Sequence, residues 1–112
     1  MFCSILDSVK KTLGIGSADD SFDQDIIMHI NTVLANLVQM GVGPKEGFAI
    51  SDNVPVWEDF IGESPKMSQV QTYVYLKVKM LFDPPTSSTL LESTNRMASE
   101  LEWRLYSENG GF

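Results

Sequence analysis

The stretch from Gln69 to Pro85, QVQTYVYLKVKMLFDPP, constrains the fold more than any other part of the chain. It is the most apolar run in the sequence, and as a helix it would carry apolar side chains on nearly every side. Such a helix is normally buried on several sides. Pro84 disfavours the α conformation at Asp83, so the helix should end there. We predict a central helix over 68–83, with some of its surface left over for a partner molecule.

The same stretch also alternates like a strand. Val74, Leu76 and Val78 would lie on one face, and Tyr73 and Tyr75 on the other. Alternation of β-branched and aromatic residues is typical of a half-buried strand. However, the run is longer than an average strand and contains no glycine or other turn residue. A helix is therefore favoured.

We expect the chain to form a single domain over 1–112. Apolar spacing and turn residues divide it into helices and one long loop, which should contain a short strand near Phe48–Ile50 or a helical turn near Trp57. This pattern predicts an all-α fold, a small bundle of about four helices with one long irregular loop. The predicted segments are a helix over 1–16, a helix over 21–40, the loop over 41–67, the central helix over 68–83, a helix over 87–107 and a flexible tail over 108–112.

The composition narrows the classes of function. The net charge is −7, from 15 acidic and 8 basic residues, which disfavours binding to nucleic acid through its phosphates. A single cysteine, Cys3, excludes an intramolecular disulfide, and the first residues do not form a signal-peptide pattern. No apolar run is long enough to span a membrane. We expect a protein of a reducing cytoplasm with no membrane partner.

No catalytic constellation is visible in the sequence. His29 is the single histidine, and only Asp25 could face it from one helical turn away. Zinc requires three or four ligands at set spacings, which are absent. Glu100 and Glu102 are two residues apart on a predicted helix and therefore face different ways. We expect no catalytic residue, no cofactor and no metal site, and we expect that the protein is not an enzyme.

The sequence therefore favours a protein that acts by binding, and its outward aromatic and basic residues are the candidates for contact with a partner molecule. The last helix should have an inner stripe flanked by Leu91 and Ala98, with Trp103 and Arg104 on the outer face. The stripe consists of Leu90, Thr94, Met97, Leu101 and Leu105. Trp57 fits either a contact residue or a lid over the core. The predicted interface residues are Trp57, Tyr73, Tyr75, Trp103, Arg104, Gly110, Gly111 and Phe112.

Several stretches in order, FDQDIIMHINTVLANLVQMGVGP, WEDFIG and TYVYLKVKMLFDPPTSS, resemble the head–tail connector (head-completion or adaptor) proteins of tailed bacteriophages. The resemblance implies a helical subunit that forms a homo-oligomeric ring of about a dozen copies, a dodecamer, beneath the portal protein. The ring would extend the DNA channel and contact the next neck or tail protein, and the tail over Ser107–Phe112 is the candidate for insertion into the portal. A different class also fits, a small acidic cytoplasmic regulator or inhibitor that acts by protein–protein binding.

Overall fold

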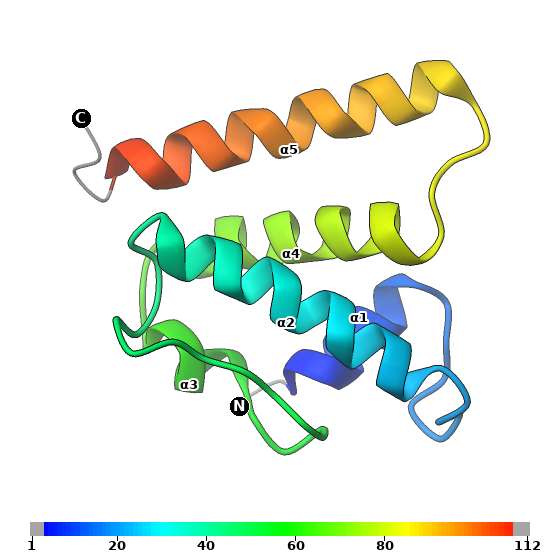
Figure 1. The fold of residues 1–112 in the computed structure, drawn as a ribbon, viewed down its shortest axis with the longest axis horizontal. Helices are drawn as coiled ribbons and strands as arrows, with labels where there is room; N and C mark the ends of the chain where they lie inside the picture. The colour runs from blue at the N-terminus through cyan, green and yellow to red at the C-terminus, as the bar shows by residue number, and fades with distance from the viewer. Residues whose placement is uncertain (1–3, 109–112) are drawn as a thin grey trace.

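The computed structural model describes residues 4–108 and is built from helices (Figure 1). The prediction of an all-α fold is confirmed, and the irregular loop contains a helical turn in place of the alternative strand. Within residues 4–108, the one extended pairing is an isolated antiparallel bridge between Ser4 and Val56. The helices are α1 (Ile5–Thr12), α2 (Asp23–Gln39), α3 (Trp57–Ile61), α4 (Met67–Phe82) and α5 (Ser88–Glu108).

Helix α4 is the centre of the molecule, because it packs against all four other helices. Its inner side chains include Val70, Tyr73, Val74 and Val78, all of which are buried. The helix ends at Asp83, whose backbone is extended (φ −145°, ψ 71°) just before Pro84.

The surface that we expected α4 to leave for a partner is small. Of its large apolar side chains, only Leu81 counts as exposed, with 49% of its surface accessible. The four surrounding helices cover the rest more completely than the sequence suggested.

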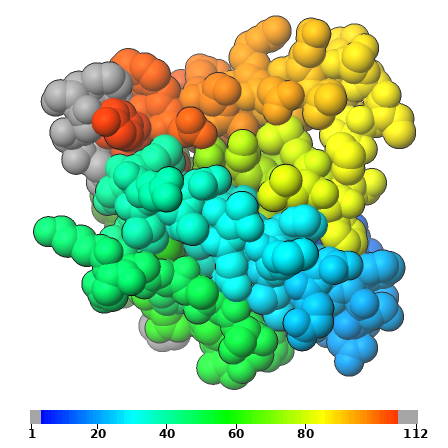
Figure 2. Space-filling model, in the orientation of Figure 1, coloured from blue at the N-terminus to red at the C-terminus, as the bar shows by residue number. Residues whose placement is uncertain are grey.

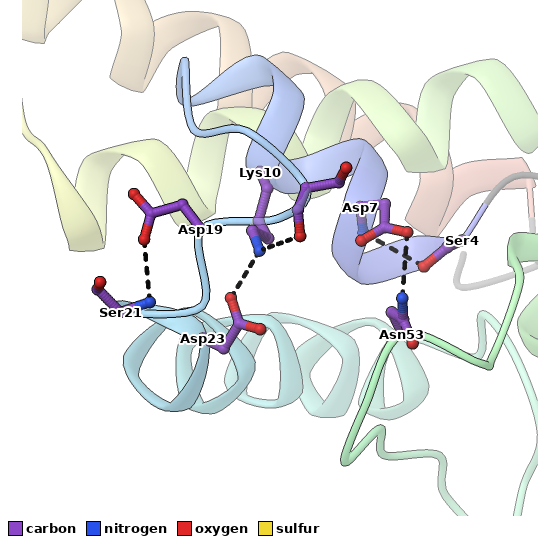
Figure 3. A network of polar contacts seen from close by, with 8 residues as sticks. Ser4, Asp7, Lys10, Asp19, Ser21, Asp23 and Asn53 are labelled. Carbon is purple, nitrogen blue, oxygen red and sulfur yellow. Dashed lines mark hydrogen bonds and ion pairs between the residues drawn. The ribbon is translucent and has the colours of Figure 1, made fainter.

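Helix α1 is fastened to the start of α2 by a buried lysine. The ammonium group of Lys10 lies 2.8 Å from a carboxylate oxygen of Asp23 and donates a hydrogen bond of 3.2 Å to the carbonyl of Ser17 (Figure 3). Only 1% of Lys10 is exposed, and a buried charge persists only when it is paired. This pair holds the loop over 13–22 against α1.

The long loop is held by side-chain contacts in place of a strand. Helix α2 ends in a Schellman turn, in which Val42 donates its N–H to the carbonyl of Leu37 and Gly41 donates to Val38. Further on, the Asn31 side chain of α2 donates to the carbonyl of Ile50 (2.9 Å) and accepts from its N–H (2.8 Å). Residues 48–50 form no strand, and the two bonds to Asn31 hold Ile50 against α2.

Helix α5 lies along one edge of the molecule, and α4 is the helix it packs against (Figure 1). Its inward side chains are Ala98 and Leu105, both buried. The predicted inner stripe was therefore partly wrong. Leu90 and Met97 are 56% and 51% exposed, because α5 is rotated to bring the small Ala98 against α4.

Candidate interaction surface

Trp57, one of the predicted contact residues, belongs to the core. None of its surface is exposed, and its indole N–H donates to the hydroxyl of Ser8 at 3.2 Å. Its ring also packs edge-on against Tyr75, with 5.9 Å between ring centroids. Because the indole N–H of Trp57 has a hydrogen-bond partner inside the chain, burial of the side chain leaves no polar group unpaired. The burial of Trp57 in the single chain fits the alternative of a lid over the core.

Tyr73, another of the predicted contact residues, is likewise buried in the single chain, with 1% of its surface exposed. Its hydroxyl donates a 2.8 Å hydrogen bond to a carboxylate oxygen of Glu102 on α5. Burial raises the pKa of Tyr73 well above its ordinary value, and the bond to Glu102 raises the pKa further. Tyr73 therefore fastens α5 to α4. Tyr75 is half-buried and packs edge-on against Trp57.

Trp103 and Arg104 lie on the outside of α5, as the sequence indicated. Trp103 is 62% exposed, and Arg104 forms an ion pair of 3.5 Å with Glu100, one turn earlier. An ion pair between such exposed side chains contributes little to stability. Gly110, Gly111 and Phe112 lie outside the described residues.

A cleft of about 350 Å³ opens beside Trp103, where α5 passes the end of α2. Apolar side chains from both helices line it, with one hydroxyl and one carboxylate among them. These residues are Met40, Ser99, Glu102, Trp103 and Tyr106. The cleft could not be predicted from the sequence, because Met40 and Trp103 are far apart along the chain.

Four large apolar side chains of α5 are exposed, and Leu90, Met97 and Tyr106 were not among the predicted contact residues. Their spacing could have indicated this surface. Leu90 and Met97 are seven residues apart, as are Leu91 and Ala98, and only one of these two stripes can face α4. Leu90 and Met97 share one side of α5, whereas Trp103 and Tyr106 lie on another, so the four side chains form two exposed apolar patches. Another exposed apolar residue, Val54, lies in the long loop with 75% of its surface accessible.

Groups that could carry chemistry are not assembled within residues 4–108. No set of three histidine, cysteine or carboxylate side chains lies close enough there to hold a metal ion. His29 packs edge-on against Phe82, 6.4 Å between ring centroids. The described helices also include none with the length and apolar character needed to cross a bilayer.

These features define a small all-helical protein that exposes large apolar side chains on an outer helix. A comparison with protein families is consistent with that description: the family model described as phage connector protein matches residues 5–111. The chain belongs to the phage connector protein family. No curated protein and no solved structure matches it significantly. Family membership gives the protein a structural role at the junction of phage head and tail, as a component of the virion.

Proposed function

We propose that this connector assembles into a ring between the portal protein and the next neck or tail protein, where it extends the DNA channel and completes the head after packaging. The family match is the observation that carries the proposal. It also favours a connector over the acidic regulator, since a regulator would have no reason to share a connector sequence over 5–111. The ring would form on the portal, after assembly of the subunit in the host cytoplasm.

The exposed side chains of α5 support self-association. Leu90, Met97, Trp103 and Tyr106 are between 40% and 62% exposed, although each is large and apolar. Contact with another copy would remove them from water. A contact that joins different surfaces of identical copies closes into a ring when the rotation between copies allows. About a dozen copies is the number that the resemblance to connectors implies.

The charge of the chain suits passage of DNA through such a ring. Each copy carries a net charge of −7. A channel wall of this sign repels phosphates, so DNA moves through without sequence-specific contact. The protein would act by binding alone, with no catalytic turnover.

The decisive experiment mixes the purified protein with the portal protein of the same phage. Light scattering and negative-stain electron microscopy should find rings of the connector stacked on portal rings, with no such rings when an unrelated portal protein is used. A protein that stays monomeric alone and does not bind its portal would contradict the proposal. Capture of a soluble host protein in place of the portal would favour the regulator.

A further inference from the structure

Helix α5 is held to the rest of the molecule by little buried surface. Of its nineteen side chains over 88–106, fourteen are exposed and only Ala98 and Leu105 are buried. A 2.8 Å hydrogen bond from Tyr73 of α4 to Glu102 adds a polar contact. We call helices α1–α4 the body. Because few contacts break when α5 leaves the body, its release should need far less free energy than global unfolding.

The linker between α4 and α5 is not fastened to the rest of the molecule. Helix α4 ends at Asp83, and α5 begins on a cap of its own, in which the Ser87 hydroxyl accepts a 3.3 Å hydrogen bond from the N–H of Leu90. Among the described residues, no hydrogen bond ties 84–86 to another element. Two of these three residues are prolines, which favour an extended chain. The five linker residues, 83–87, span at most about 18 Å, enough to carry α5 to an adjacent copy.

Exposed apolar side chains surround this linker. Leu81 is 49% exposed just before it, and Leu90 is 56% exposed just after it. Phe22, 45% exposed, lies at the same end of the molecule, because its ring packs edge-on against Phe82 with 5.6 Å between centroids. The linker runs along the right-hand edge of Figure 1, and Figure 2 shows it in yellow at the surface of that edge. An exchange of α5 between two copies would bring their linkers together and cover these side chains.

We propose that α5 of each copy docks on α4 of the next copy, in place of that copy's own α5, an inference that rests on the proposed ring. The structure supports this occupant, because the face of α4 around Tyr73 already binds an α5 within one chain. The α5 of a neighbour has the same Glu102, Ala98 and Leu105 and would make the same contacts. Such a domain swap is a low-cost route to association. Repeated from each copy to the next, it joins different surfaces of identical copies, as a ring requires.

The contacts around the linker decide between the two arrangements. The contact of α5 with α4 is the same in both, so its strength favours neither. The exchanged form gains the burial of Leu81, Leu90 and Phe22, and it loses the freedom of separate copies. The closed form should therefore dominate in an isolated chain. The exchanged form should dominate when the portal holds copies side by side.

Distances between spin labels on α4 and α5 test the exchange in the full chain. Cys3→Ser removes the native thiol, and Lys77→Cys with Ser99→Cys then carry the labels. These two sites line neighbouring grooves that share Met40 and Glu102, so the labels lie close together in a single copy. Doubly labelled chains, diluted in unlabelled copies, should show this short distance as monomers and lose it in rings assembled on the portal. Singly labelled chains, mixed in equal amounts, should show the short distance between copies.

The matched control pair is Lys77→Cys with Gln39→Cys. Gln39 lines the same groove as Lys77 but belongs to α2, which stays in the body. The short distance of this pair should persist within each chain, in monomers and in rings alike. All labelled sites border grooves open to solvent, so each labelled chain should unfold at a temperature close to that of the unchanged protein.

A charge beside the linker tests the contact that the exchange creates. Leu81→Glu should raise the connector concentration that occupies half of the portal rings at least about tenfold. Met28→Glu places the same charge on an apolar residue that is 58% exposed on α2, and it should assemble like the unchanged protein. Sedimentation of portal rings over a range of connector concentrations measures both variants. Equal effects of the two charges would overturn the placement of this contact.

Each contrary outcome identifies what has failed. If the unchanged protein does not assemble on its portal, the ring and the exchange fall together. If rings form while doubly labelled chains keep the short distance, the ring stands and the exchange is wrong. Loss of that distance without its appearance between copies would mean that α5 detaches and docks on no neighbour, which also overturns the exchange. A short distance between copies in the control pair would show that the copies are only crowded together.

Discussion

Helix α2 buries most of its large apolar side chains, whereas helix α5 exposes most of its own. Six of the seventeen residues of α2 are buried, and they pack into one core with α1, α3 and α4. Helix α5 is longer, yet only Ala98 and Leu105 among its described side chains are buried, and four large apolar side chains face solvent. Stability should therefore reside in α1–α4, whereas α5 is docked on that body and presents a surface. Substitutions can test this division.

The largest effect is expected at the centre of the body. Trp57→Ala should lower the free energy of unfolding by about 3–5 kcal/mol, because it removes a fully buried indole and leaves a cavity. The matched control is Trp103→Ala, the same change on the outside of α5, which should alter the free energy of unfolding by no more than about 0.5 kcal/mol. Guanidinium denaturation of both variants measures the difference. Equal losses would remove the distinction between body and α5.

A second pair of variants tests how tightly the long loop closes on the body. Gly43 has φ +95°, and an added Cβ would lie 2.6 Å from the ring of Phe60, whereas Gly47 has φ +97° with no atom within 4 Å of its Cβ position. Gly43→Ala should therefore cost about 2–4 kcal/mol of stability, from backbone strain and overpacking together. Gly47→Ala carries the strain alone and should cost about 1–2 kcal/mol. Similar losses in a denaturation experiment would mean that Phe60 yields freely, so that the loop is loosely packed.

The bond between Tyr73 and Glu102 links the two regions. Tyr73→Phe should lower the free energy of unfolding by about 1 kcal/mol, a modest loss because the exposed Glu102 regains water. Amide hydrogen exchange should quicken in α5 and remain slow in α2. Uniform acceleration across both helices would contradict a local fastening role.

The same bond predicts a dependence on pH. Burial, and then Glu102, raise the pKa of Tyr73 in the folded state. Unfolded chains begin to lose the phenol proton near pH 10, while the folded protein keeps it, so the stabilisation is complete below about pH 10. Above it, stability should fall by at most about 1.4 kcal/mol per pH unit. Denaturation midpoints at pH values on either side of 10 measure this slope, and Tyr73→Phe should reduce it.

Local signals were enough to predict the helices of the body. Pro84 ends α4 and Gly41 terminates α2 by chemistry that depends only on neighbouring residues. Local signals could not predict the burial of Trp57, because its hydrogen-bond partner Ser8 is 49 residues away along the chain.

The orientation of α5 depended on a subtler choice. The predicted inner stripe was right at Leu101 and Leu105 and wrong at Leu90 and Met97, which are exposed. Ala98, which was expected at the edge of the stripe, is buried, and a small residue lets two helices approach closely. The error concerned Leu90 and Met97, and it concealed an exposed apolar patch.

The smallest effect is expected where that error lay. Leu90→Ala should change the free energy of unfolding by no more than about 0.5 kcal/mol, because Leu90 already contacts water. Leu105→Ala, the same substitution on the same helix at a fully buried site, should cost about 2–5 kcal/mol. Both should be measured at concentrations low enough to keep the chains monomeric. If Leu90→Ala proved as costly as Leu105→Ala, the outer stripe would be part of the fold of a single chain, and α5 would have no apolar surface to spare for another copy.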